Sequence, residues 1–550
     1  MHIISQRTKK IMEECKIKAR EAGLKFDDGT LEYIVTNSDL LELRPKFMIP
    51  TMYDYWVHDV GIISGNRIYE VYPNNPYETV INTRPAISFY NDNNPDWMNT
   101  FIFYHVLAHI DVIQNNVFFQ KTWDYDFCAR AISDKRLITK LREELGENKR
   151  WVDYAIEFSR SIDNLIGYHQ DLNDIQDSSN YFSPRFNFYF DIFLDKFAKA
   201  KSTEYLNEIE RYNKLLAEFG ENKAENLFFE TVENKYKNFN DSFKNSREEK
   251  PKINLDIMQY IMEYSEFLNK PANKWMKQII EIIRHTSLLF APQIRTKILN
   301  EGWASYWHEK LFLNDKKIRG HEIDFASINA EVVAIRRVGL NPYGIGKKLL
   351  EFAEDLANKG KLDYEFQGMK NETERENYDK KTSNGQKFIF HLRKYFDDFQ
   401  LFKFLNTDNF QDFVTKNNLF VAGRKLNLEK QTWEYYIKSR KGENYRQMII
   451  DSLYHPPHTV VAGEKTKKNE LYIDHKFENK QLVAKYIPDV MRGLNYFWGG
   501  PVKLETTAFD INKEELINMY VNPDYKQNYK ERRVLYELED YKKNPSIKNL

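Results

Sequence analysis

The sequence has few cysteines, no long uninterrupted hydrophobic run and no excess of charge of either sign. Cys15 and Cys128 are the only cysteines in 550 residues, which excludes a disulfide framework or a cysteine-based zinc site and is typical of a reducing compartment. No segment approaches the roughly 18 apolar residues of a membrane helix, and no apolar run follows the charged start of the chain. We therefore expect a cytoplasmic protein with no membrane partner.

The charges of the chain cancel, because 81 basic residues face 81 acidic ones. No global field then attracts nucleic acid, so we expect no nucleic-acid partner. Hydrophobic residues make up 42% of the chain and aromatic residues 15%, which is typical of a tightly packed protein rather than a disordered one. The length favours two to four domains.

The hydrophobic periodicity predicts a mainly α fold with a small α+β domain at the C-terminus. We expect a large helical core over residues 1–340, in which 198–252 form a charged helical insertion. A helical extension over 341–420 follows, and then an α+β domain with a charged helical tail over 421–550. Within that last domain, alternation predicts a strand over 435–452.

Other local patterns predict individual elements. Residues 5–23, 27–41 and 97–121 are interpreted as helices, and 77–85 as a buried strand. Pro292 is expected to interrupt the helix that precedes it, because proline lacks the N–H that continues a helix.

The clearest chemical pattern is a pair of histidines on one helix and a glutamate on another. His105 and His109 are spaced i, i+4, which places both imidazoles on one helix face within reach of a single ion. Glu301, Ser305 and His308 form a polar row on a second helix that is otherwise apolar and aromatic. A buried polar row needs partners, and a metal ion is one such partner. The sequence thus predicts a metal site at His105, His109 and Glu301.

Each of these residues also has a structural interpretation. Paired histidines occur in protein cores as packed, hydrogen-bonded residues. Glu301 could instead form a buried ion pair with Arg284 or Arg295. His285 and His308, taken singly, are more typical of packing or of supporting a ligand than of binding a metal. The metal hypothesis depends on two distant helices meeting in space.

Several blocks of sequence carry a resemblance to one family. They are residues 77–85, 105–116, 292–308 and 341–346, with 472–475 and 496–499 near the C-terminus. The chain resembles the stage V sporulation protein R (SpoVR-like) family along nearly its whole length. The resemblance implies a link to bacterial sporulation, specifically spore cortex assembly, or to stress survival, with stress-response or sporulation proteins as partners.

The block Asn300-Glu-Gly-Trp-Ala304 is also similar to the Asn-Glu-Gly-Phe-Ala helix of gluzincin metallopeptidases. There the glutamate is the third zinc ligand after a His-Glu-x-x-His pair, so the resemblance implies a metallopeptidase-like helical core that holds Zn²⁺ at His105, His109 and Glu301. Val106 stands where those enzymes have the glutamate that deprotonates the metal-bound water.

Another group must then transfer the proton, and the candidate catalytic residues are Glu78, Asp111 and His308. Arg295 and Tyr306 are the candidate substrate-binding residues, although neutralising Glu301 is the favoured role of Arg295.

Two function classes remain open. One is a metal-dependent hydrolase of a peptide or peptidoglycan-like amide, which the Asn-Glu-Gly-Trp-Ala block favours. The other is a non-catalytic scaffold or regulatory protein with a structural or degenerate metal site, which Val106 favours.

Overall fold

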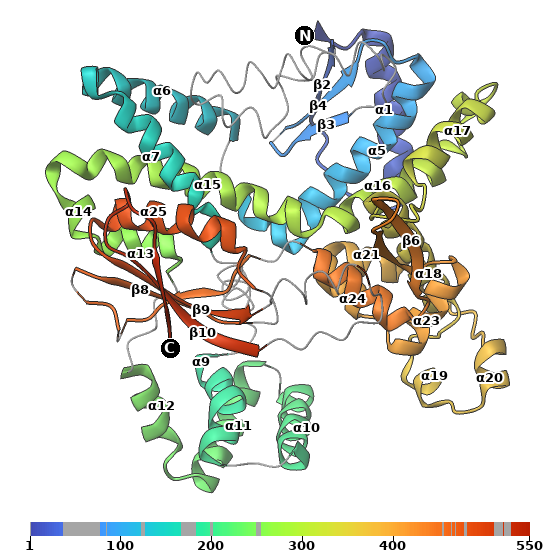
Figure 1. Cartoon of the computed structure of the whole chain (residues 1–550). Helices are drawn as coiled ribbons and strands as arrows, with labels where there is room; N and C mark the ends of the chain where they lie inside the picture. Colours follow the sequence, from blue (N-terminus) through green and yellow to red (C-terminus); the bar gives the residue numbers. More distant parts are fainter. Residues whose placement is uncertain are drawn as a thin grey trace.

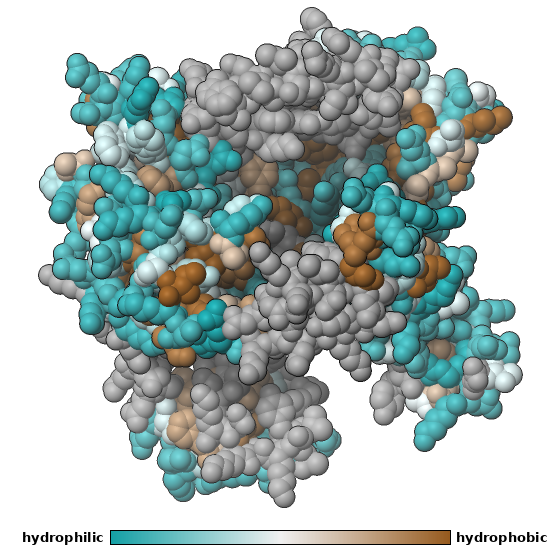
Figure 2. Space-filling view, in the orientation of Figure 1, coloured by the Kyte–Doolittle hydropathy of each residue, from teal (hydrophilic) through white to brown (hydrophobic). Residues whose placement is uncertain are grey.

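The chain is mostly helical, with a small sheet-containing region at its C-terminal end (Figure 1). The computed structural model describes residues 2–36, 78–83, 85–122, 127–166, 183–198, 202–219, 221–248, 255–453, 456–463, 465–467, 469–477, 481–510, 521 and 530–550. Within these residues, no helix has the length and apolar character needed to cross a membrane. Figure 2 shows a face on which hydrophilic residues predominate and hydrophobic ones form separate patches.

The first hydrophobic core forms around three helices, α5 (Asp96–Asn115), α16 (Lys297–Phe312) and α18 (Pro342–Asn358), with α1 (Gln6–Glu21) and α21 (Gly385–Tyr395) beside them (Figure 1). Helix α5 is buried along nearly its whole length, which explains why apolar residues occupy all of its faces. The predicted helix over 97–121 is confirmed, although it gives way after Asn115 to a 3₁₀ turn.

Helices α16 and α18 touch backbone to backbone. A Cβ atom added at Gly302 would overlap the backbone of Gly346, and one added at Gly346 would overlap the carbonyl oxygen of Ile298. Only glycine permits such a close crossing, so the glycines of the 292–308 and 341–346 blocks have a packing role. Residues 341–346, which form the N-cap and the start of α18, therefore belong to the core of the helical unit.

A four-stranded sheet covers the N-terminal side of this core in the order β1-β2-β4-β3. Strand β2 (Thr30–Val35) runs parallel to β4 (Ala86–Asn91), and β3 (Glu78–Ile81) pairs antiparallel with β4. The strand predicted over 77–85 is confirmed at 78–81, where the chain forms β3. The helix predicted over 27–41 is wrong at 30–35, where the chain forms β2, and 37–41 lie outside the described residues.

The second core combines α7 (Arg150–Ser161) and α15 (Lys274–Arg295) with α25 (Ile487–Trp498) and a five-stranded sheet. The order of the sheet is β11-β10-β9-β8-β7, and its strands are β7 (Thr459–Val461), β8 (Leu471–His475), β9 (Val502–Asp510), β10 (Lys530–Leu538) and β11 (Ser546–Asn549). The predicted helical tail is wrong for residues 530–550, because β10 extends the sheet beside β9. Helix α15 runs from this core toward α16 (Figure 1). It continues through Pro292 and ends at Arg295, contrary to the predicted interruption.

A third, aromatic core holds η5 (Phe188–Phe197), α10 (Ser202–Phe219), α11 (Glu221–Lys235) and α12 (Phe239–Glu248) together. Residues 202–248 are helical wherever the structure describes them, except for a short turn before α12. They pack on the aromatic rings of η5, so this highly charged stretch has its own small hydrophobic core. The predicted domain boundaries remain a prediction.

Most of the remaining elements contribute residues to the first or the second core. Strand β6 ends at Ser439 and α24 begins at Gly442, so the strand predicted over 435–452 is wrong in its second half. The elements not yet given are β1 (His2–Ile3), α6 (Phe127–Leu145), α9 (Pro184–Asn187), α13 (Ile257–Tyr264), α14 (Glu266–Asn269), α17 (Glu322–Val332), α19 (Tyr364–Gly368), α20 (Glu372–Asn377), α22 (Asp398–Lys403), α23 (Thr407–Lys416), α24 (Gly442–Ser452), β5 (Val421–Asn427) and β6 (Thr432–Ser439).

Candidate metal centre

Helices α5 and α16 pack against each other and bring His105, His109 and Glu301 together. One donor atom from each of the three side chains lies within 4.8 Å of the other two. The Oε2 atom of Glu301 is 3.6 Å from Nε2 of His109 and 4.0 Å from Nε2 of His105. Around a tetrahedral zinc ion with bonds of about 2.0–2.1 Å, ligand atoms are about 3.3–3.5 Å apart. The three side chains therefore fit a zinc ion after a small inward movement.

A chain of hydrogen bonds fixes the tautomer of His105. The side-chain amide of Asn329 donates to the Glu309 carboxylate, which orients its oxygen toward His308. Since that oxygen can only accept, Nε2 of His308 is the donor across 2.9 Å. When His308 is neutral, its Nδ1 accepts from Nδ1–H of His105, 2.7 Å away. The lone pair of His105 is consequently on Nε2, the atom that faces Glu301.

The second histidine is oriented in the same way. Nδ1 of His109 donates to the side-chain oxygen of Asn300 across 2.9 Å, which again leaves the lone pair on Nε2. Metal-binding histidines almost always have such a partner behind them. Burial lowers the pKa of His105 well below its ordinary value, and the neighbouring His109 lowers this pKa further. His105 is therefore held in the neutral form that binds metal ions.

Helix α18 contacts both His105 and the end of the hydrogen-bonded chain behind it. The ring of Tyr343 stacks on His105 with centroids 6.0 Å apart. Lys347 forms ion pairs with Glu309 at 3.0 Å and with Glu351 at 2.8 Å. The hydrogen-bonded chain behind His105 therefore ends in a charged pair that anchors α18 to α16.

The start of α16 is held by a buried carboxylate from α22. The two oxygens of Asp398 accept the backbone N–H groups of Ile298 and Leu299, each at 2.8 Å. These groups have no partner within the helix, so the carboxylate caps it. Burial raises the pKa of Asp398 to about 8, against the effect of both hydrogen bonds. This cap fixes the first turn of the helix that carries Glu301.

Comparison with known proteins identifies the family. The profile of the family described as "SpoVR like protein" matches residues 4–455. The chain belongs to the SpoVR-like family. This SpoVR-like chain is also 22% identical over 337 residues to "Uncharacterized protein YcgB" of Escherichia coli (strain K12), an alignment that covers 57% of each chain. It therefore spans little more than half the length of that relative. No solved structure matches it.

In this SpoVR-like chain, two predicted catalytic residues are bonded to other parts of the protein, and their catalytic role stays a prediction. The carboxylate of Asp111 accepts from the Lys25 backbone at 2.7 Å and from Trp303 Nε1 at 2.9 Å, and it pairs with Arg393 at 3.1 Å. Both ring nitrogens of His308 are bonded, as described above, and the residue is fully buried. His308 lies behind His105 and orients its ring.

The third predicted catalytic residue, Glu78, is the first residue of β3, a strand that packs against α5. The structure gives the backbone position of Glu78, and its side chain lies outside the described part.

The predicted substrate-binding residues also contact other parts of the protein. Arg295 forms an ion pair at 3.2 Å with Asp397, the N-cap of α22. The favoured partner from the sequence was Glu301. The hydroxyl of Tyr306 donates to Glu354 at 2.6 Å. Arg284, the other proposed partner of Glu301, binds Asp256 at 2.7 Å, and His285 bonds to Arg130.

Sequence reasoning missed the residues that orient the ligands, namely Asn300, Asn329, Tyr343 and Asp398. Asn300 directly precedes Glu301 in the Asn-Glu-Gly-Trp-Ala block, so the signal for it was present. The other three come from α17, α18 and α22, and only the packing of these helices brings them to the centre.

Proposed function

We propose that this SpoVR-like protein binds Zn²⁺ through Nε2 of His105, Nε2 of His109 and the carboxylate of Glu301, and hydrolyses a peptide or peptidoglycan-like amide bond. The observation that carries the proposal is the convergence of three acceptor atoms within 4.8 Å, with both imidazoles held in the metal-binding tautomer. Two histidines and one glutamate form the ligand set of zinc hydrolases, which leaves the fourth position for water.

In such a site, the residues of the chain orient the ligands and accept the proton. Zinc held by His105, His109 and Glu301 would supply a Lewis acid that polarises a carbonyl and lowers the pKa of a water molecule. His308 and Asn300 hold the two imidazoles at a fixed angle, and Asp398 holds the first turn of α16. Since Asp111 and His308 are bonded elsewhere, Glu78 is the remaining predicted proton acceptor, and β3 places its backbone beside α5.

The biological setting of the proposal comes from the family. We place the activity in the cytoplasm, in spore cortex assembly or in stress survival, with sporulation or stress-response proteins as partners. The metallopeptidase-like character of the helical core belongs to the same proposal and depends on the Asn300–Ala304 block.

A second candidate function is a scaffold or regulatory protein with a structural metal site. Val106 favours it, because this residue is apolar and fully buried at the position where gluzincins have the general base. Zinc would then hold α5 and α16 together without any turnover.

Elemental analysis of the purified protein tests the site. We expect close to one zinc ion per chain in the wild type, and strong loss in His109→Ala and Glu301→Gln. The control is His391→Ala on α21, an exposed histidine of the same helical unit, which should keep its zinc. A folded wild type that takes up no zinc from a zinc-containing buffer would contradict the hydrolase function and leave the scaffold with a degenerate metal site.

A second variant separates the two candidates. If Glu78 is the proton acceptor, Glu78→Gln should keep the zinc and lose hydrolysis of a peptide or peptidoglycan-fragment amide. Zinc-loaded wild type that hydrolyses neither substrate would leave the scaffold function as the supported one.

A further inference from the structure

A second site, separate from the metal centre, lies at the end of α25. A cavity of about 590 Å³ opens there between α7, α14, the start of α15, the end of α25 and the turn after β10. Its volume is in the range of small-molecule binding sites. We propose that this cavity binds a neutral carbohydrate. The proposal stands independently of zinc binding.

Aromatic rings dominate the lining of the cavity. Tyr496 is at their centre, with Trp151 parallel to it at 6.3 Å and 10°. Tyr541 meets Tyr496 edge-on at 5.5 Å, and Phe267 lies 6.5 Å from it. Aromatic faces carry partial negative charge, and the C–H bonds of a sugar ring pack on such faces. Trp151 is 40% exposed and therefore presents free surface to a ligand.

Polar groups of both kinds accompany these rings. Tyr496 is 5% exposed, and its hydroxyl has no hydrogen-bond partner among the residues that the structure describes. Burial raises the pKa of this phenol, so the hydroxyl stays protonated and can donate. Asn148 offers an amide, and Glu539 and Asp540 offer acceptors. A ligand with many hydroxyls can satisfy donors and acceptors together.

The charges at the rim favour a neutral ligand over a cation. Aromatic rings beside carboxylates can also bind ammonium groups through cation–π contacts. Here, however, Lys270 already lies 5.9 Å from the Phe267 ring and Lys542 5.8 Å from the Tyr541 ring. These two lysines offset part of the negative charge of Glu539 and Asp540, which makes a neutral ligand a better match than a cation.

The cavity explains why a glycine ends the 496–499 block. Gly499 ends α25 with a φ of +74°, a left-handed conformation that favours glycine. A Cβ atom at this position would overlap the side chain of Phe267. Glycine thus lets the end of α25 close against one of the aromatic rings of the cavity.

Isothermal titration with three soluble trisaccharides tests the proposal, and chitotriose, cellotriose and maltotriose are the probes. We expect saturable binding of at least one sugar, weakened about tenfold or more by Trp151→Ala, which removes a stacking surface. The matched control is Trp433→Ala on β6, because Trp433 is 41% exposed and lies outside the cavity. This control should bind like the wild type.

Tyr496→Phe sharpens the test because it removes only the hydroxyl and keeps the buried ring. We expect it to weaken sugar binding about threefold to tenfold, as for one lost hydrogen bond, with an unchanged melting temperature. Failure of the wild type to bind any of the three sugars would overturn the proposal. Binding that Trp151→Ala leaves unchanged, or saturable binding of tetramethylammonium in place of the sugars, would overturn it as well.

Discussion

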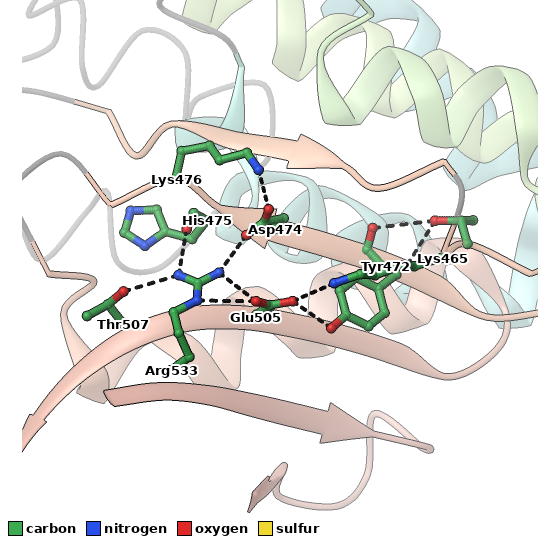
Figure 3. A network of polar contacts seen from close by, with 9 residues as sticks. Lys465, Tyr472, Asp474, His475, Lys476, Glu505, Thr507 and Arg533 are labelled. Carbon is green, nitrogen blue, oxygen red and sulfur yellow. Dashed lines mark hydrogen bonds and ion pairs between the residues drawn. The ribbon is translucent and has the colours of Figure 1, made fainter. Parts of the chain in front are cut away.

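Two polar clusters of this protein differ in how the charges of their carboxylates are neutralised. In the sheet of the second core, Arg533 donates to Asp474 at 2.7 Å and to Glu505 at 2.9 Å, and Glu505 also accepts from Lys465 (Figure 3). Every carboxylate in that network has a cation beside it. At the candidate metal centre, by contrast, lone pairs of two imidazoles point toward a carboxylate.

Burial makes this difference matter. The lysines of the sheet network are more than half exposed, so water screens their charges. The histidines of the centre are less than a tenth exposed, where a charge imbalance is costly. The sheet network is balanced by its own residues, whereas the proposed zinc ion would supply the positive charge at the centre. Four experiments extend this comparison.

The largest effect is expected at the buried ion pair beneath the centre. Asp111→Ala leaves Arg393 buried without its carboxylate, which should lower the free energy of unfolding by about 3–5 kcal/mol. The matched change in the sheet is Asp474→Ala, where Arg533 keeps Glu505 and contact with water. Urea unfolding of both variants measures the contrast. Equal losses would mean that burial does not separate the two clusters.

Zinc itself should stabilise only the centre. At a free zinc concentration 100 times the dissociation constant, we expect the wild type to gain about 2.7 kcal/mol, visible as a higher melting temperature. Glu301→Gln should show no such gain, because it loses one ligand. Glu505→Gln should respond like the wild type, since the sheet network has its own cations. A zinc response that survives Glu301→Gln would place the ion elsewhere.

A smaller effect is expected behind the ligands. His308→Ala removes the hydrogen-bond partner of His105 and should weaken zinc binding about 10- to 100-fold, which corresponds to about 1.4–2.7 kcal/mol. The control is His475→Ala in the sheet, because His475 is equally buried and bonds to Thr506. Competition with a fluorescent zinc chelator measures both affinities. If His308→Ala binds zinc like the wild type, the proposed positioning role is wrong.

The smallest effect concerns pH and the sheet network. Burial alone would raise the pKa of Glu505, but its bonds to Lys465, Tyr472 and Arg533 lower it to about 2. The unfolded chain takes up this proton near pH 4.5 and the folded chain only near pH 2. The contribution of Glu505 is therefore complete above pH 4.5 and lost as the pH falls toward 2.

Thermal unfolding at several pH values checks this sign. Glu505→Gln should cost no more than about 1 kcal/mol at pH 7 and should flatten the fall in stability between pH 4.5 and 2. A variant whose stability falls as steeply as that of the wild type would show that another carboxylate controls acid unfolding.

The sequence predicted which residues of the candidate site come together better than it predicted the strands of the fold. The spacing of His105 and His109 and the polar row at Glu301 depend only on helical periodicity, which is a local property. The partners behind them are not local. His308 was placed on the face of Glu301, but the angle between α5 and α16 turns its ring toward the back of His105.

The wrong predictions have the same cause. Residues 30–35 and 530–538 form strands because they pair with β4 and β9. Their local sequence does not identify the strand with which they pair. Pro292 stays within α15 although it has no N–H to donate to the carbonyl four residues before it, and the helix ends within one further turn, at Arg295. Local rules identified the long helices and failed where a distant segment decides the conformation.

The direct contact of α5 with α16 also separates the geometry of the centre from the length of chain between its ligands. After α5 the polypeptide builds most of the second core and all of the third before it returns in α16. The spacing of the three donor atoms is set by two touching helices and not by the residues that join them. Relatives can therefore gain or lose whole helices between α5 and α16 while the spacing of the three side chains stays constant.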